Sequence, residues 1–283
     1  MHSSDPLPIR VLVKGASTVT WISWMGGPRT DFAFPRALED ALHAQGRAAE
    51  VRNTAVLGTP THSFFEPFEQ DVAQWSPDVI VLVAGHYETI HLFLPRWFER
   101  HANRVNYRPG RFDDFYRRRV IRPIWKALAV LQFKLDGRFG LGACTRRLRR
   151  AGTDLENYVK LAQQVGSPMM LVFELLAPAP RQQQWFPGMA GRIARINEEH
   201  AAAIERLGLA HVRMFRNSEV VKRMYGDDQA AATPDGFHFT PELHGAIGAE
   251  LAEQIAAWAE TQPHLATGQS SQPHLAPARD NAG

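Results

Sequence analysis

The sequence predicts an α/β fold in three layers, α/β/α, built on five parallel strands and extended by a helical insertion. Two observations support this prediction. Short apolar runs alternate with amphipathic stretches along most of the chain. In addition, 79–84 reads Val-Ile-Val-Leu-Val-Ala, a continuous and largely β-branched run that is typical of a central parallel strand. Strands that alternate with helices form a parallel sheet with helices on its two faces.

The individual elements follow from periodicity and from turn residues. We expect strands at 9–13, 50–55, 79–84, 169–175 and 210–214. Helices are expected at 34–46, 64–75, 154–164, 188–207 and 241–260, where apolar residues recur every three or four positions. The aromatic, glycine-containing stretch 21–28 is too irregular for an element, and we expect a loop near the functional site there.

The chain divides into one domain, an insertion and a tail. Residues 1–261 are expected to form a single domain, and its hydrophobic fraction is high enough for a sizeable core (45% over the whole chain). Residues 92–150 are far too long for an ordinary connection and carry amphipathic stretches, so we expect a helical insertion. Residues 262–283 repeat Gln-Pro-His-Leu-Ala in a polar, Pro-rich context, and we expect a disordered tail.

Basic residues are concentrated in the insertion. Residues 96–150 contain sixteen Lys and Arg against four acids, so this segment carries +12 although the whole chain carries only +3. Its most basic stretches are Arg117-Arg118-Arg119, Arg122, Arg146-Arg147 and Arg149-Arg150. These form either a solvated helical face or a site for an anionic partner, such as a carrier protein, coenzyme A or a membrane surface. No nucleic-acid-binding motif is present, so we do not expect a nucleic acid partner.

Several classes of protein are not indicated by the composition. Cys144 is the only cysteine, which leaves no intramolecular disulfide and no cysteine-type metal cluster. The first six residues do not resemble a signal peptide, and no apolar run is long enough to span a bilayer, so we expect a cytoplasmic protein. The histidines lack metal-ligand spacing and the glycine pairs lack the pattern of a phosphate loop. We therefore expect neither a metal nor a cofactor.

Chemistry is indicated at the two ends of the predicted sheet domain. Ser17 follows the first strand, and the carboxyl edge of an open parallel sheet is the usual place for a site. Asp235 and His238 are three positions apart in a loop before the final helix, which lies at the same edge. A serine needs a base to remove its proton, and a histidine oriented by a carboxylate is the usual base.

At these residues the sequence resembles the SGNH hydrolases, also called the GDSL family of esterases and lipases. The resemblance spans about 9–91 and 152–260 and rests on four separated blocks. Gly15-Ala16-Ser17 stands where that family has Gly-Asp-Ser, and Asp235 to His238 match its Asp-x-x-His. The resemblance implies a flavodoxin-like sheet, with Ser17 as nucleophile, His238 as base and Asp235 as the partner of His238.

The two middle blocks imply the groups that bind the oxyanion and the substrate. Asn53 to Gly58 is similar to the second block, whose glycine donates a backbone N–H, so the resemblance implies this role for Gly58. Gly85-His86-Tyr87-Glu88 stands where the family has Gly-x-Asn-Asp/Glu. Tyr87 thus replaces the asparagine that helps to bind the oxyanion, and it either supports or blocks this site. His86 is the alternative polar group beside it, and Ala16 replaces an aspartate that does not react.

The expected function is hydrolysis of an ester, thioester or other acyl carbonyl through an acyl-enzyme on Ser17. The substrate would be a small acyl compound. Three alternatives stay open from the sequence: an acyltransferase that uses the same three residues, a binding protein whose oxyanion site is altered by Tyr87, and an adaptor that acts through its basic insertion.

Overall fold

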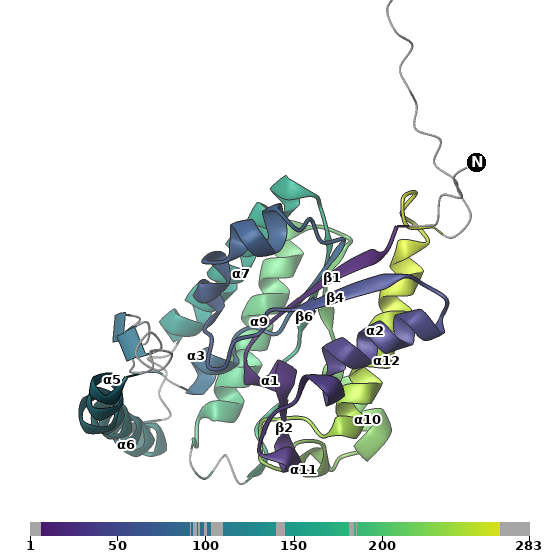
Figure 1. The fold of residues 1–283 in the computed structure, drawn as a ribbon. Coiled ribbons are helices and arrows are strands. Elements are labelled where there is room, and N and C mark those ends of the chain that lie inside the picture. Colours follow the sequence, from purple (N-terminus) through teal and green to yellow (C-terminus); the bar gives the residue numbers. More distant parts are fainter. Residues whose placement is uncertain are drawn as a thin grey trace, which may run out of the picture.

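The centre of the protein is a five-stranded parallel sheet (Figure 1). The computed structural model describes residues 7–90, 92, 95, 97–98, 101–102, 110–139, 145–180, 184 and 186–266. The strands lie in the order β4 (Ala49–Asn53), β1 (Ile9–Lys14), β5 (Val79–Leu82), β6 (Met169–Phe173) and β7 (Val212–Phe215), and all neighbours are parallel. This is the flavodoxin-like order that the resemblance implied.

Helices cover the two faces of the sheet and complete the three layers. The α-helices of the described residues are α1 (Ser17–Thr20), α2 (Phe34–Ala44), α3 (His86–Ile90), α5 (Arg111–Tyr116), α6 (Arg122–Phe139), α7 (Thr145–Val165), α9 (Met189–Leu207), α10 (Asn217–Tyr225), α11 (Gln229–Ala232) and α12 (Pro241–Ala259). Of these, α5 and α6 belong to the insertion and do not cover the sheet. Figure 1 shows α2 and α12 on one side of the sheet and α7 and α9 on the other. The predicted α/β/α architecture is confirmed.

The core consists of two apolar layers that share the strands. Successive residues of a strand point to opposite faces, so Val11 and Val13 pack toward α2 and α12 while Leu12 packs toward α7 and α9. In β5 all four residues are buried, as the apolar run predicted. Burial on both faces explains why these strands are continuously apolar and do not alternate with polar residues.

The packing of α12 against α2 brings the last helix to the start of the chain. Gly248 of α12 lies so close to α2 that a Cβ there would be 2.6 Å from Ala37 Cβ and 2.7 Å from the backbone nitrogen of Leu38. The backbone N–H of Phe34 also donates to His244 Nδ1 at 3.1 Å. The N-terminus of α12 is therefore held beside the segment that follows β1.

Where it is described, the insertion is helical, and it is anchored by buried polar contacts. The π-helix η5 (Arg117–Ile121) joins α5 to α6 without interruption. Asp136 of α6 accepts from Arg192 at 2.7 Å, and their side chains are 1% and 5% exposed. Gln132 donates to the carbonyl of Ile90 at 2.6 Å and accepts from the N–H of Leu92 at 2.9 Å. These contacts hold α6 against α9 and the end of α3.

Some element boundaries were wrong in the sequence-based prediction. The helix expected at 154–164 begins at Thr145, within the expected insertion, because Leu148 and Ala151 continue its buried face. The helix expected at 64–75 is instead a 3-10 helix, η3 (Thr61–Phe65), followed by a π-helix, η4 (Glu69–Ala73). The helix α10, between β7 and the His238 loop, was not predicted.

The stretch 21–28, expected to be an irregular loop, forms a small hairpin. The strands β2 (Trp21–Ile22) and β3 (Gly27–Pro28) pair antiparallel across the 3-10 helix η1 (Ser23–Met25), and a second 3-10 helix, η2 (Thr30–Phe32), follows. Gly26 ends η1 in the left-handed conformation with φ 70°, which allows so short a reversal. The expectation that this stretch lies near the functional site is tested below.

The sequence-based prediction places the start of the disordered tail too early, at residue 262. Leu265 is buried in the core beside α12, and the N–H groups of Leu265 and Ala266 donate to the carbonyl of Gln262. Residues 267–283 lie outside the described residues.

None of the helices within the described residues has the length and hydropathy to cross a membrane. In the same part of the chain no cluster of three or more His, Cys, Asp or Glu could hold a metal ion.

His200 on α9 is a buried imidazole packed under the chain reversal at Gly85. It is 0% exposed, and neither ring nitrogen has a hydrogen-bond partner among the described residues. Burial lowers the pKa of His200 to about 4. Since an unfolded histidine titrates near 6.5, the unfolded chain binds more protons between pH 6.5 and 4. His200 therefore destabilises the fold progressively as the pH falls through this window.

We predict that His200→Phe, which keeps a ring of similar size, flattens the pH dependence of stability. The slope of unfolding free energy against pH should fall by up to about 1.4 kcal/mol per pH unit below pH 6.5. Urea unfolding at several pH values between 4.5 and 6.5 measures this slope. The control is His43→Gln, which changes an exposed histidine. An unchanged slope, or a wild-type His200 that titrates near 6.5 by NMR, would contradict this prediction.

Candidate active site

Ser17 is placed by the exit of β1 from the sheet. The strand ends at Lys14, and three residues later Ser17 begins α1. Gly15 makes this exit possible, because a Cβ there would lie 2.5 Å from Val19 Cγ2 and 2.9 Å from Val83 Cβ. Only glycine allows the backbone to pass so close to the residue that follows β5. The serine is thereby fixed at the carboxyl edge of the sheet, between two neighbouring strands.

The loop that carries His238 is organised by Asp235. One carboxylate oxygen, Oδ1, accepts from the backbone N–H of Phe237 at 3.0 Å and of His238 at 2.9 Å. This local turn explains why the two residues are three positions apart. Gly236 has φ 95°, which a side chain would strain, and its N–H donates to the carbonyl of Thr233. The loop leads directly into α12, whose N-cap is Thr240.

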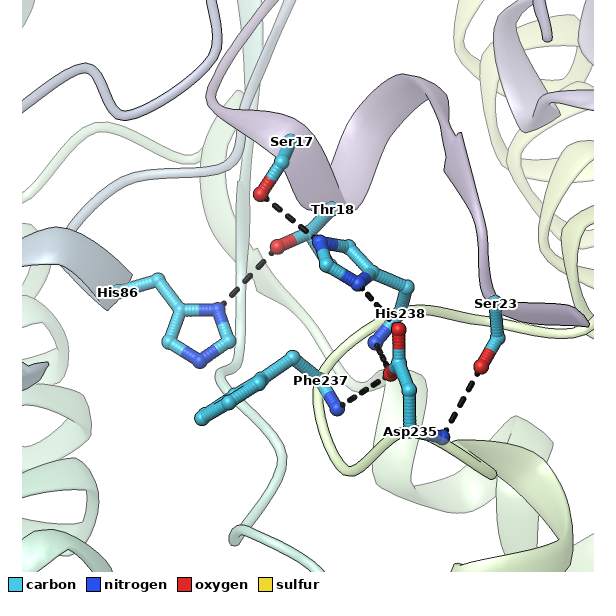
Figure 2. Close-up of polar contacts among 7 residues, drawn as sticks. All are labelled: Ser17, Thr18, Ser23, His86, Asp235, Phe237 and His238. Atoms are coloured by element: carbon cyan, nitrogen blue, oxygen red, sulfur yellow. Dashed lines mark hydrogen bonds and ion pairs between the residues drawn. The ribbon is translucent and has the colours of Figure 1, made fainter. Parts of the chain in front are cut away.

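Ser17, His238 and Asp235 form one continuous hydrogen-bonded chain (Figure 2). His238 Nε2 lies 3.0 Å from Ser17 Oγ, and His238 Nδ1 lies 2.6 Å from Asp235 Oδ2. The structure therefore brings together three residues that the sequence placed 218 and 221 positions apart. Both distances are in the range of good hydrogen bonds.

The charge on Asp235 decides which nitrogen of His238 carries the proton. Burial alone raises the pKa of Asp235, but hydrogen bonds from the His238 ring and from two backbone N–H groups outweigh it and lower the pKa to about 2. The carboxylate is thus ionised at neutral pH and can only accept. Nδ1 of a neutral His238 then holds the proton, which leaves Nε2 free to accept from the Ser17 hydroxyl.

Aromatic rings and the hairpin hold the His238 loop in place. Trp21 stacks on the His238 ring, with centroids 5.4 Å apart and planes at 29°. Ser23 Oγ accepts from the backbone N–H of Asp235 at 3.0 Å (Figure 2). The stretch 21–28 is therefore near the site, as expected, although it is not an irregular loop.

His86 lies on the far side of Thr18 from His238, as Figure 2 shows. Its Nδ1 is 3.2 Å from Thr18 Oγ1, and its ring packs edge-on against Phe237 at 5.4 Å. Burial, with a smaller contribution from His238, lowers the pKa of His86 to about 4, so the ring is neutral at neutral pH. His86 thus contacts the residue after Ser17, and its expected role in substrate binding stays a prediction.

The cavity beside His86 is too small for a substrate. Its volume is about 10 Å³, which is room for one water molecule. Thr18, His86, Asn217 and Phe237 are among its lining residues, and Asn217 Oδ1 is buried without a partner among the described residues. Ser17 is not among the residues that line this cavity.

Tyr87 and Gly58, from the two middle sequence blocks, are in contact. A Cβ on Gly58 would lie 3.6 Å from Tyr87 Cε2, so the tyrosine ring packs beneath the glycine. Tyr87 is 7% exposed and its hydroxyl is buried from solvent. Glu88 supports the same region, because its Oε1 accepts from the backbone N–H of Thr61 at 2.7 Å.

Gly85 faces the interior of the protein. A Cβ there would lie 2.4 Å from Ile196 Cδ1 and 3.2 Å from His200 Cε1, both on α9. Its φ of 95° turns the chain from β5 into α3. Gly85 thus sets the position of His86 and Tyr87 by close packing, and a direct contact with substrate remains a prediction.

Three contacts of the site were not anticipated from the sequence. They are the pairing of Thr18 with His86, the support of Asp235 by Ser23, and the stacking of Trp21 on His238. The only sequence signal was the aromatic composition of 21–28. The two hydroxyl contacts join residues far apart in the chain, and no spacing rule relates them.

Comparison with known proteins rests on structure. No protein-family model matches the sequence, and no curated protein matches it. A lipase/acylhydrolase from Enterococcus faecalis is 13% identical, with a TM-score of 0.55 over 88% of this chain and 96% of its own. A GDSL-like lipase from Bacteroides thetaiotaomicron is 14% identical, with a TM-score of 0.51 over 88% and 89%. Est24, a carbohydrate acetylesterase from Sinorhizobium meliloti, is 15% identical, with a TM-score of 0.50 over 88% and 99%.

The chain has the fold of the GDSL-type lipases and esterases. The five-stranded order and the flanking helices of this chain agree with that fold. At identities of 13–15% the likeness concerns the fold, so any argument about chemistry must come from the residues of this chain.

Proposed function

We propose that this protein is a serine hydrolase that cleaves an ester, thioester or related acyl bond through an acyl-enzyme on Ser17. The observation that carries the proposal is the pair of contacts made by His238, 3.0 Å to Ser17 Oγ and 2.6 Å to Asp235 Oδ2. A hydroxyl, an imidazole and a carboxylate in this order are the arrangement that activates a serine nucleophile.

In the proposed reaction, Ser17 Oγ attacks the acyl carbonyl while His238 Nε2 takes the hydroxyl proton. Asp235 keeps the other nitrogen protonated and stabilises the imidazolium that forms. Collapse of the tetrahedral intermediate breaks the bond to the alcohol or thiol, which leaves with the proton from His238. Water, activated by the same imidazole, then attacks the acyl-enzyme and releases the acid and free Ser17.

We assign the oxyanion to backbone donors. Ser17 is the first residue of α1, and the first N–H groups of a helix have no partner within the helix. The second proposed donor is the N–H of Gly58, in the loop after β4. Tyr87 lies next to Gly58, but its hydroxyl is buried from solvent, so we do not assign it a direct contact with the oxyanion.

For the substrate we propose small acyl esters. Proteins with this fold include a carbohydrate acetylesterase and an acetylxylan esterase, so acetyl esters of sugars and of simple phenols are the first compounds to assay. Transfer of the acyl group to an alcohol other than water needs the same three residues. Product analysis with and without an added alcohol separates hydrolysis from transfer.

The first prediction concerns the nucleophile. A fluorophosphonate probe should label the folded wild-type chain on Ser17, as read by peptide mass analysis, because the probe reacts with activated serines. Ser17→Ala should abolish labelling and ester hydrolysis, whereas Ser63→Ala should leave both unchanged. A folded wild-type chain that is not labelled would contradict the proposal and favour a binding protein in which Tyr87 fills the oxyanion site.

The second prediction concerns Asp235. In Asp235→Asn, the amide oxygen can still accept from the N–H groups of Phe237 and His238, so the loop should remain folded. The amide NH₂ would face Nδ1 and force the proton onto Nε2, which can then no longer accept from Ser17. We expect kcat to fall about 10⁴-fold with an unchanged unfolding midpoint. A loss below tenfold would argue against a catalytic role for Asp235.

The third prediction concerns the tyrosine that replaces the family's asparagine. Because the Tyr87 hydroxyl is buried, Tyr87→Phe should keep most of the wild-type kcat on an activated ester. Steady-state kinetics on the wild type and the variant give the ratio of their kcat values. A drop of about 10²–10³-fold in kcat would instead identify the hydroxyl as an oxyanion donor.

A further inference from the structure

The outer face of the insertion helices is the largest feature that the proposed chemistry does not use. The helices α5, η5 and α6 form one continuous helical segment, which we call the insertion helix (111–139). Figure 1 shows α5 and α6 standing away from the three layers, at the side of α3 and α7. This segment therefore presents much of its circumference to solvent.

The inner face of the insertion helix is fully occupied. Ile121 packs with Phe98 and Ala102 in a small separate core, to which Trp125 and Leu128 are added. Further along, the Asp136–Arg192 ion pair and the contacts of Gln132 attach α6 to the main body. With this face fixed, the residues on the opposite face cannot turn inward.

Large apolar side chains are exposed along the insertion helix. Phe112 is 79% exposed and Phe115 is 61% exposed, and the two are one helical turn apart on α5. On α6 the exposed apolar residues are Ile124, Val130, Leu131 and Phe133. Single exposed apolar residues are common, but several on one helical segment mark a surface for binding.

Most charges among these apolar residues are positive, although Asp113 and Asp114, between the two phenylalanines, are only partly buried. The exposed charged residues of the insertion helix are Arg111, Arg118, Arg119, Arg122, Lys126, Lys134 and Arg138. No acidic residue of 110–139 belongs to the exposed class. Asp114 is paired with Arg117 at 2.6 Å, and Asp136 is buried with Arg192. The outer face is therefore both apolar and cationic.

This combination fits the surface of an anionic membrane. Aromatic and aliphatic side chains of such a helix enter the boundary between headgroups and acyl chains, while Lys and Arg reach back to anionic headgroups. A nucleic acid would use the cations and could stack bases on the phenylalanines, but it would leave the aliphatic Ile124, Val130 and Leu131 in solvent. We propose that the insertion helix (111–139) binds peripherally to membranes that contain anionic lipids.

Vesicle flotation with the full-length protein tests this proposal. Vesicles of phosphatidylcholine with about one third phosphatidylglycerol should carry the protein upward, and pure phosphatidylcholine vesicles should carry much less. Added salt should weaken the binding, because the headgroup attraction is screened. Ser17 is not part of the insertion helix, so the Ser17→Ala variant should float as the wild type does. The result is therefore independent of the proposed catalysis.

Two pairs of variants separate the apolar and the electrostatic parts. Phe112→Ser/Phe115→Ser and Arg118→Glu/Arg119→Glu should each weaken vesicle binding at least tenfold, by an order-of-magnitude estimate. The matched control is Leu7→Ser/Met224→Ser, which removes exposed apolar side chains elsewhere and should change nothing. Unchanged thermal unfolding shows that each variant is folded.

Two results would overturn the proposal. One is a wild-type protein that does not bind the anionic vesicles. The other is an Arg118→Glu/Arg119→Glu variant that loses binding while Phe112→Ser/Phe115→Ser keeps it in full. That pattern would describe a surface for soluble polyanions, and retention of the Phe112→Ser/Phe115→Ser variant on heparin would confirm it.

Discussion

The close packing of α12 on α2 is the constraint on which the candidate site depends. Ser17 and His238 are 221 positions apart, and the hairpin contacts of Trp21 and Ser23 join their loops only at the site itself. Because Gly248 has no side chain, α12 can lie in close contact with Ala37 and Leu38 of α2. The hydrogen bond from Phe34 N–H to His244 holds the N-termini of the two helices together. The His238 loop immediately precedes α12, so this contact carries the imidazole to the serine. A site built from both ends of a chain thus depends on this helix pair together with the hairpin.

Much of the fold could be predicted because burial leaves a clear pattern in the sequence. The run 79–84 is apolar because β5 is covered on both faces, and the apolar residues of α12 recur where the helix faces the sheet. The prediction was wrong where the backbone departs from the ideal period. The π-helix η4 is an example, since a fixed 3.6-residue repeat does not describe it. The start of α7 was missed for a different reason, because its regular repeat continues into residues that the basic composition had assigned to the insertion.

The candidate site was predictable to the extent that its geometry is local or follows from topology. Asp235 and His238 are close because one turn joins them, and Ser17 reaches them because parallel strands end at one edge. The pairing of Thr18 with His86 depends instead on which way two side chains rotate. The same holds for the burial of the Tyr87 hydroxyl, which the sequence left open between supporting and blocking the oxyanion site. Such choices are made by packing, and a single sequence does not record them.

The π-helix η5 also sets the register between the two halves of the insertion helix. Each residue of an α-helix turns the chain by about 100°, so the wider turn at Arg117–Ile121 determines how the face of α5 lines up with the face of α6. Removing one residue there would leave composition and charge almost unchanged, yet it would rotate α5 by about 100° relative to α6. The length of this one turn, more than the identity of its arginines, decides whether the exposed side chains form a single surface.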